Sequence, residues 1–322
     1  LRHQKKNEKT KSTFALGTIS LTMVTKQELI KVSDAGVHRL ELPQSNGFLR
    51  NTLLQLNEVS HEVYVLGTLV DPNLKLTEAF EMTNGVVQFV TDLESPQVWR
   101  TKLIKIEQGD LDPKAIEYSD YKTINIKEGS VDLKFSDAEM VQDPNGGFYF
   151  LGFANVTTVV DMDKYKYEVL DKGPILIISF DENGVVQWKK IVGFHQTWIG
   201  SVFSESAGVK PIATKNGISL LYLGKSAVPP AKKIDGGRFQ TDTQPDLAKT
   251  QLVRIDVTSD DVVRKDIMGT SEFHFSPQLR SAIPDASGEN IWLVAKGTKK
   301  EMLKVVKRTP VSGQFIYHVQ LN

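Results

Sequence analysis

Histidine and cysteine are the residue types that most often hold a metal or begin a reaction, and this chain offers little of either. It contains six histidines and no cysteine. No two histidines have the spacing of a zinc-binding motif, and the lack of cysteine removes thiolate nucleophiles, disulfides and cysteine-ligated zinc. We therefore predict no metal site.

Two of the histidines occupy equivalent places in the chain. His195 and His274 each follow a phenylalanine, in Gly193-Phe194-His195 and Glu272-Phe273-His274. One interpretation is that both face one opening of the fold, as ligands or as a general base. The interpretation that we favour is a repeated packing element between units. Both histidines are kept as candidate binding residues.

Acidic residues in the long connections offer an enzymatic alternative. Two carboxylates at a suitable separation would serve glycoside cleavage, although acidic residues in loops are usually only solvated. The sequence contains no serine-nucleophile elbow, no phosphate-binding loop and no complete calcium loop. We therefore predict no catalytic residue and no cofactor, with a glycoside hydrolase or lyase as the alternative. The candidate carboxylates are Asp71, Asp92, Asp235, Asp242 and Asp246.

The same connections carry aromatic side chains and an arginine, which are common at recognition surfaces. Up-and-down strand order would bring these connections to one face of the molecule. We predict that this face binds a protein or a glycan. The candidate binding residues, besides the two histidines, are Phe80, Phe89, Tyr165, Tyr167, Arg238 and Phe239.

A repeat of short strands must position these residues. Its clearest copy spans 146–192, with a strand that ends at Gly152, a second strand over 175–178, the turn 181–184 and a third strand through Trp188. Apolar, β-branched strands of this kind suit burial on both faces, and Asp-Gly and Asn-Gly turns tolerate positive φ. Four such strands in up-and-down order form one blade of a β-propeller.

Five units can be traced, and six or seven remain open if 68–98 contains another, since 86–91 also has the pattern of a strand. We predict that 102–106 and 302–306 are third strands of their units, followed by outer strands over 114–118 and 314–321. The first unit has no visible innermost strand. The glycines that end the first clear strand of later units are Gly67, Gly152, Gly224 and Gly297.

Residues 146–188 resemble a repeat of exported bacterial β-propeller proteins, in which a Gly-Gly-aromatic strand is followed by Asp-x-x-Gly and Trp. They are also distantly similar to the Asp-box of sialidase-type propellers and to the quinoprotein docking repeat, with a different spacing from each. In both families the aspartate caps a hairpin turn and the tryptophan packs between blades. The resemblance therefore implies structural roles for Asp181, Gly184 and Trp188, and no catalytic role.

The bulk composition excludes some partners and suggests a location. Lys plus Arg and Asp plus Glu are balanced at 39 each, so no charge excess favours nucleic acid. No apolar run reaches the ~18 residues of a membrane helix. We interpret 1–12 as a polar tether and 13–322 as a single propeller domain. Because the chain starts at Leu1 rather than Met, we expect export to the periplasm or cell surface, with a lipid-anchored N-terminus as one form of it.

The sequence thus predicts a non-catalytic binding or scaffold module of the bacterial cell envelope. A propeller glycoside hydrolase or lyase is the first alternative, and an envelope assembly factor acting through protein contacts is the second. The ligand, the partner and the oligomeric state are left open.

Overall fold

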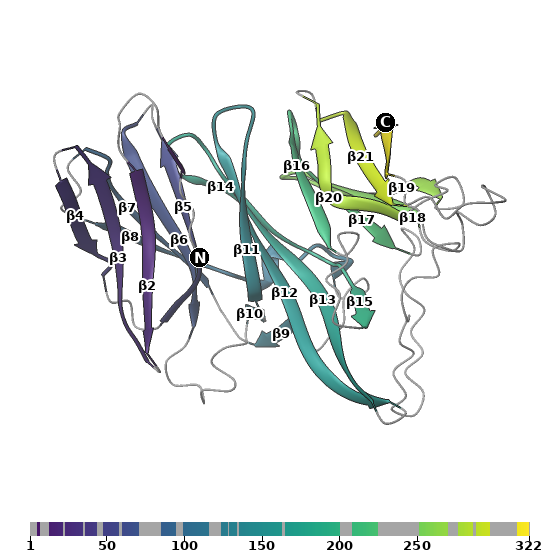
Figure 1. Cartoon of the computed structure of the whole chain (residues 1–322), viewed down its shortest axis with the longest axis horizontal. Coiled ribbons are helices and arrows are strands. Elements are labelled where there is room, and N and C mark those ends of the chain that lie inside the picture. Colours follow the sequence, from purple (N-terminus) through teal and green to yellow (C-terminus); the bar gives the residue numbers. More distant parts are fainter. Residues whose placement is uncertain are drawn as a thin grey trace.

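The computed structural model shows an all-β protein whose antiparallel sheets stand side by side along an open arc (Figure 1). The structure describes residues 5–6, 13–21, 23–34, 36–43, 48–57, 60–70, 85–94, 99–115, 124–127, 129–133, 135–162, 165–199, 208–224, 251–269, 276–285, 288–296 and 314–321. Within these residues the named elements are strands, apart from one short 3-10 helix, η1 (Gln108–Asp110).

Five sheets, called blades 1 to 5 below, follow one another in sequence. Blade 1 holds β1 (Lys5–Lys6), β2 (Thr13–Leu21), β3 (Met23–Ser33) and β4 (Gly36–Glu41). Blade 2 holds β5 (Phe48–Asn57), β6 (Glu62–Val70), β7 (Gly85–Asp92) and β8 (Arg100–Lys105). Blade 3 holds β11 (Phe135–Gln142), β12 (Phe148–Met162), β13 (Tyr165–Phe180) and β14 (Val186–Val192), and β15 (Gln196–Ile199) pairs with β13. Blade 4 holds β16 (Val209–Thr214), β17 (Gly217–Gly224), β18 (Gln251–Val257) and β19 (Val262–Gly269). Blade 5 holds β20 (Ser276–Pro284), β21 (Asn290–Lys296) and β22 (Gln314–Gln320). A separate hairpin, β9 (Ile124–Lys127) and β10 (Ser130–Leu133), lies in sequence between blades 2 and 3.

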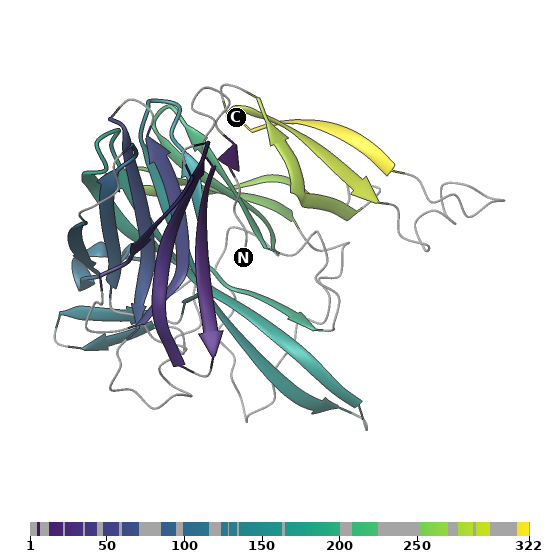
Figure 2. The ribbon, with the colours of Figure 1, turned by 60° about the vertical axis from the view of Figure 1, so that its left-hand side comes forward.

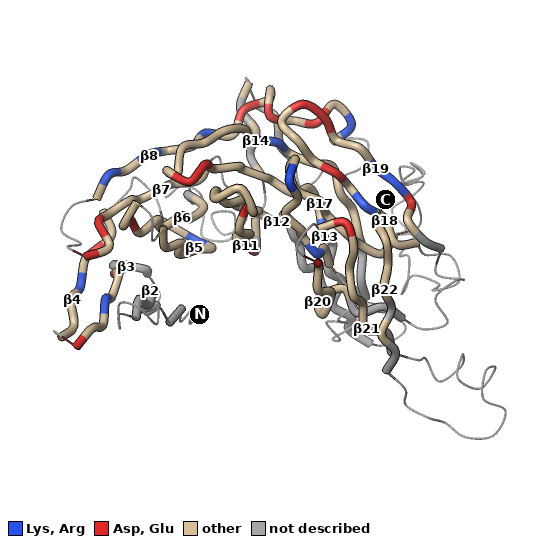
Figure 3. The backbone as a smooth tube through the Cα atoms, turned by 90° about the horizontal axis from the view of Figure 1, so that it is seen from above, with Lys and Arg blue, Asp and Glu red and all other residues tan. Residues whose placement is uncertain are grey.

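The blades are arranged radially. Their first strands touch in turn, β5 on β11, β11 on β16 and β16 on β20. Seen from above, these strands lie on the concave side of the arc and the outer strands β8, β14 and β19 lie on the convex side (Figure 3). Up-and-down sheets placed around a shared axis form a β-propeller, which confirms the predicted fold class.

Continuous apolar runs build this arrangement because successive side chains of a strand point to opposite faces. In β12, Phe148 and Phe150 belong to the apolar cluster shared with blade 2, whereas Tyr149 and Leu151 belong to the cluster shared with blade 4. All four are at most 3% exposed. Each fully buried side chain of this size contributes roughly 2–3 kcal/mol, so both faces of blade 3 are strongly stabilised.

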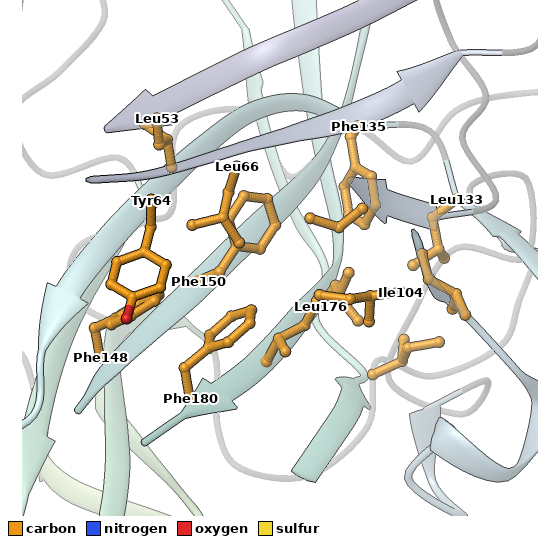
Figure 4. Packing of buried hydrophobic residues seen from close by; sticks show 14 of the residues in the cluster. Leu53, Tyr64, Leu66, Ile104, Leu133, Phe135, Phe148, Phe150, Leu176 and Phe180 are labelled. Atoms are coloured by element: carbon orange, nitrogen blue, oxygen red, sulfur yellow. The ribbon is translucent and has the colours of Figure 1, made fainter. Parts of the chain in front are cut away.

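Four such clusters join the five blades in sequence order. Figure 4 shows the one between blades 2 and 3, where Leu53 and Tyr64 meet Phe180 and Phe150. The rings of Phe148 and Phe180 stack with their centroids 4.7 Å apart. The β9–β10 hairpin adds Val131 and Leu133 to the same cluster, so it fills the space at one end of this interface.

A tight turn of blade 3 reaches into blade 2. The Asp181 carboxylate accepts hydrogen bonds from the backbone N–H groups of Asn183 and Val185, at 2.9 and 2.8 Å. Gly184 follows at φ +69°, and a Cβ there would lie 2.3 Å from the Tyr64 ring. Gln88 donates a hydrogen bond to the Gly184 carbonyl at 2.8 Å. Only glycine fits this position, because both the backbone angle and the space exclude a side chain.

Blade 2 differs from the sequence prediction. Its third strand is β7, not 102–106, and 100–105 forms the outer strand β8 instead. Of the predicted outer strand 114–118, the described Lys114 lies in a turn after η1 and Ala115 has a helical conformation, so neither is in a strand. The error arose because 86–91 was taken as part of a loop or of a hidden unit, although it completes this blade.

The two end blades also required correction. β1 pairs with β2 through Lys5 and Lys6, so blade 1 does have a short innermost strand, despite its polar sequence. In blade 5, β22 pairs directly with β21 and is therefore the third strand rather than the outer one. The predicted strand over 302–306 and the predicted repeat glycine Gly297 lie outside the described residues.

A long hairpin replaces one of the predicted loops. The stretch 153–173 was expected to be a loop, but β12 and β13 continue through it, pairing from Asn155 with Lys172 to Met162 with Tyr165. Seen from the side, this hairpin projects away from the body of the arc (Figure 2). The run of β-branched residues Val and Thr at 156–160 is the strand signal that the sequence prediction missed.

A buried ion pair ties the outer strands of blades 3 and 4 together. The Arg264 guanidinium on β19 contacts the Asp112 carboxylate at 2.9 Å, and the two side chains are 5% and 7% exposed. The same guanidinium donates to the Gly193 carbonyl at 3.2 Å, and the Asp112 backbone N–H donates to Ile191 at 3.0 Å. Asp112 therefore links the segment after η1 to two blades.

We expect Gly184→Ala to lower the free energy of unfolding by about 2–4 kcal/mol, since it adds a positive-φ penalty to a steric clash with Tyr64. Gly129→Ala is the matched control, because Gly129 has φ +84° and open space around its Cβ position. Chemical denaturation of both variants should show a loss of only about 1 kcal/mol for the control. Equal losses would show that the turn does not press into blade 2.

We expect Arg264→Leu to lower the free energy of unfolding by about 3–5 kcal/mol, because Asp112 would be left buried without its partner. The double variant Asp112→Leu/Arg264→Leu should recover most of that loss. Arg39→Leu removes an exposed ion pair with Glu28 (side chains 63% and 26% exposed) and should cost less than about 1 kcal/mol. A double variant as unstable as Arg264→Leu would contradict this account.

Candidate functional site

The structure has an open cleft between the inner parts of blades 3 and 4. Its volume is about 340 Å³, which suits a small ligand or part of a larger one. Blade 3 contributes β11, β12 and β13, and blade 4 contributes β16 with the residue before it. The lining residues are Asp137, Glu139, Phe153, Lys172, Gly173, Phe194, Gly208, Val209, Lys210 and Pro211.

Strand alternation places two carboxylates on one wall of the cleft. Asp137 and Glu139 are two residues apart on β11 and are both exposed. Their neighbours Ala138 and Met140 point to the other face, where they pack against the cluster shared with blade 2. Because a residue in a strand rises about 3.3 Å, the two α-carbons are roughly 7 Å apart. The carboxylates therefore stand side by side along the cleft.

Two lysines contribute positive charge to the same cleft. Lys172 lies on β13 and Lys210 lies on β16, and both are partly buried. Gly208 has φ +112°, and a Cβ there would lie 2.9 Å from the Lys172 ammonium. A side chain at 208 would therefore displace this ammonium, so glycine keeps the lysine in its place.

A glutamine fixes the start of β16 against blade 3. The Gln196 side chain, which is 8% exposed, donates to the Leu223 carbonyl at 2.8 Å and accepts from the Gly208 backbone N–H at 3.0 Å. Both bonds are buried, which makes them costly to break. The blade 4 wall of the cleft is thus held by hydrogen bonds as well as by packing.

Two aromatic side chains add apolar surface. Phe194 is 2% exposed and packs edge-on against Tyr222, with ring centroids 4.8 Å apart. Phe153 is partly buried against the cluster shared by blades 3 and 4. The cleft therefore combines the partly exposed Phe153 ring, two carboxylates and two ammonium groups, and it can accept and donate hydrogen bonds while packing on an apolar surface of a ligand.

Some of the residues predicted from the sequence to form the binding face are described by the structure, and none of these lines the cleft. Phe89 is on β7, is fully buried (0% exposed) and packs edge-on against Trp99, so the prediction that it is exposed on a loop is wrong. Tyr165 and Tyr167 lie on β13 in the projecting hairpin rather than in a loop. His195 follows the cleft residue Phe194 and is partly exposed. The remaining predicted binding residues, which lie outside the described part of the chain, are Phe80, Arg238, Phe239 and His274.

Of the predicted loop carboxylates, one can be placed. Asp92 ends β7, is exposed, and accepts a hydrogen bond from the Glu94 backbone N–H at 2.8 Å. The others, outside the described residues, are Asp71, Asp235, Asp242 and Asp246. The repeat residue Trp188 packs against the cluster shared by blades 3 and 4, with its ring 5.9 Å from that of Tyr149.

The sequence reading missed the charged residues of the cleft. Asp137 and Glu139 alternate with the apolar Ala138 and Met140 in β11, and that pattern was the available signal. Lys172 and Lys210 could not be found in this way, because only the packing of blade 3 on blade 4 brings them together.

In the part of the chain that the structure describes, no group of three or more His, Asp or Glu side chains could hold a metal ion. A search of the same residues finds no helix with the length and apolarity that crossing a bilayer requires.

Comparison with known proteins supports no family assignment. No protein-family model matches the chain, and no curated protein matches it by sequence. A putative exo-β-1,3-galactanase from Bifidobacterium bifidum s17 is 8% identical, with 100% of this chain and 87% of that chain covered and a TM-score of 0.36. The β-propeller domain of the trilobed protease from Pyrococcus furiosus is 9% identical, with 96% and 64% covered and a TM-score of 0.34. An endo-arabinase from Bacteroides thetaiotaomicron is 11% identical, with 100% and 95% covered and a TM-score of 0.32. At these values the likeness says nothing about the activity of this chain.

Burial raises the pKa of two tyrosines beside the blade interfaces. The pKa of Tyr64 rises to about 12, chiefly through desolvation, and its hydroxyl donates to Glu62 at 2.7 Å. The pKa of Tyr149 is also raised by burial, with a further contribution from Asp143. Both hydroxyls therefore stay protonated at neutral pH and act as buried hydrogen-bonding groups.

We expect the stability conferred by protonated Tyr64 to be complete below pH 10 and to be lost as the pH rises from about 10 to about 12. The unfolded chain ionises first, since its tyrosine has the ordinary pKa. Urea denaturation between pH 9 and 11.5 should show a shallower decline for Tyr64→Phe than for the unmodified protein. Lysine titration is common to both proteins and cancels in this comparison. An equal decline of the unfolding free energy in the two proteins would contradict the assignment of this pH dependence to Tyr64.

Proposed function

We propose that the protein is a non-catalytic binding module that takes a glycan in the cleft between blades 3 and 4. The observation that carries the proposal is the combination, in one cleft of about 340 Å³, of the partly exposed Phe153 ring, two carboxylates and two lysines. Sugars need this combination, because they present apolar C–H faces and many hydroxyl groups.

Each group in the cleft has a matching role. The partly exposed Phe153 ring offers surface for the C–H face of a sugar. The carboxylates of Asp137 and Glu139 accept hydrogen bonds from hydroxyls, and bonds to a charged acceptor are stronger than neutral ones. Lys172 and Lys210 donate to ring and hydroxyl oxygens, and they would also pair with the carboxylate of an acidic sugar.

The shape of the site favours a glycan over a protein. Specific protein contacts bury roughly 800 Å² on each partner, which exceeds what a narrow cleft between two inner strands presents. An end of a glycan chain enters such a cleft more easily than a folded surface does.

Hydrolysis of a glycan is the second candidate function. Asp137 and Glu139 lie two residues apart on one strand, with their α-carbons roughly 7 Å apart, and glycosidases act with a pair of carboxyl groups. Such enzymes place their two carboxyl groups on opposite sides of the scissile bond. Two neighbours on one strand approach from the same side, which is why binding is preferred here.

We also propose that the protein works outside the cytoplasm, at the periplasm or cell surface, as a single propeller domain that includes the short strand β1. The support is the resemblance of residues 146–188 to a repeat of exported bacterial β-propeller proteins.

Calorimetric titration with a panel of neutral and uronic-acid oligosaccharides tests the proposal. We expect at least one to bind, and Asp137→Asn/Glu139→Gln to weaken its binding at least about tenfold through the lost hydrogen-bond strength. The Asp260→Asn variant changes an exposed carboxylate in the β18–β19 turn and should bind as the unmodified protein does. Thermal unfolding without ligand should be the same for all three.

Release of reducing sugar from the bound oligosaccharide distinguishes the two candidates. A binding module releases none, whereas a hydrolase releases sugar and loses that activity in Asp137→Asn. Binding to no member of the panel, or equal binding by the double variant, would refute the cleft as a glycan site.

A further inference from the structure

The last blade of the arc has one buried face and one bare apolar face. Ile291 and Leu293 of β21 point toward blade 4 and are 0% exposed. On the opposite face, Ile283, Trp292 and Ile316 are 65%, 49% and 71% exposed. These three residues come from all three strands of blade 5.

This bare face is ordered as a packing surface. Trp292 lies opposite Ile283 of β20 and opposite His318 of β22 in the strand register. The Trp292 and His318 rings lie 4.6 Å apart at 34°. Ile316 stands one row along, opposite Val294. The face therefore presents a continuous row of side chains across the sheet, as the covered faces of the inner blades do.

Blade 1, at the other end of the arc, also has one buried face, toward blade 2, and one exposed face on its other side. Leu29 and Leu42 point toward blade 2 and are 1% and 4% exposed. On the opposite face, Val32 and Val37 lie across from each other on β3 and β4 and are 43% and 60% exposed, and the Arg39–Glu28 ion pair lies on the same face. Figure 3 shows blades 1 and 5 at the two ends of the arc, with the other blades between them.

We infer that the bare face of blade 5 binds the bare face of blade 1 of a second copy of this chain, end to end. The argument is continuity with the interfaces already present. In each of the four apolar clusters, the face of one blade packs on the facing side of the blade that follows it. Blade 5 offers the side that a following blade covers, and blade 1 offers the side that a preceding blade covers.

A contact of this kind joins two different surfaces, so its symmetry consequences differ from those of a face-to-face dimer. Repetition of the contact gives a closed ring if the rotation closes and an open chain of copies if it does not. In both cases the apolar rows on both end blades are removed from water, which is the driving force. The contact uses neither wall of the cleft between blades 3 and 4, so it is independent of the proposed glycan site.

The test uses one lysine at each end. Ile316→Lys places a charge on the blade 5 face, and Val37→Lys places one on the blade 1 face. Sedimentation velocity over a range of concentrations should show association of the unmodified chain and at least about tenfold weaker association of either variant, because an ammonium would be buried unpaired. Val263→Lys is the control, since Val263 on β19 is 40% exposed but lies on neither end face. Circular dichroism should show the same fold for all four.

A mixture of the two variants gives the decisive result. The Ile316→Lys copy keeps an intact blade 1 face, and the Val37→Lys copy keeps an intact blade 5 face. One intact contact can therefore form between them, and native mass spectrometry of the mixture, with one variant labelled with ¹⁵N, should show mixed dimers that neither variant forms alone. If Ile316→Lys does not fold, Trp292→Glu tests the same face.

Three results would overturn the inference. A monomer at all concentrations up to about 100 µM would show that the end faces do not bind a second copy with a dissociation constant below about 100 µM. Loss of association in Ile316→Lys but not in Val37→Lys would indicate a symmetric contact between two blade 5 faces. Equal weakening by Val263→Lys would place the contact elsewhere.

Discussion

The burial of both faces of each inner sheet is the constraint on which this structure depends. A strand whose every residue is apolar cannot leave one face in water, so each inner blade needs a neighbour on either side. The residues 148–151 and 175–178 satisfy this by alternating between the two clusters that flank blade 3. Sheets with two apolar faces pack side by side, and this packing gives the radial order of the blades. The cleft lies between two of these packed sheets, blades 3 and 4.

This constraint could be predicted from the sequence where the apolar run was continuous. Blades 3 and 4 have such runs and clear Gly-containing turns, and their strands were placed correctly apart from the continuation of β12 and β13 through 153–173 and the added strand β15. Blade 2 was misassigned because a strand inside a long connection, β7, has the same apolar character as the strands around it. Nothing in its local sequence says which of two apolar segments pairs with β6, since that choice depends on the packing of the whole blade.

The candidate site was harder to predict for a related reason. Its charged residues come from three strands in two blades, and only the packing of those blades determines which of them meet. The sequence drew attention to aromatic residues in connections, yet Phe89 is buried in the core and two tyrosines lie in the hairpin of β12 and β13. Exposure is a property of the folded neighbourhood, so residue type alone could not separate binding residues from core residues.

Among the described residues, each of the four apolar clusters joins successive blades, which makes the molecule nearly one-dimensional in its energetics. Each blade is held by its nearest neighbours, so cooperativity decays along the arc in the way described for solenoids. The middle blade is held from two sides and each terminal blade from one. Amide protons of β12 and β13 near Phe150 and Ile177 should therefore exchange most slowly, and partial opening should begin at the ends and advance inward. Partly unfolded forms, with the end blades open and the middle blades still structured, would therefore be populated before the fully unfolded chain.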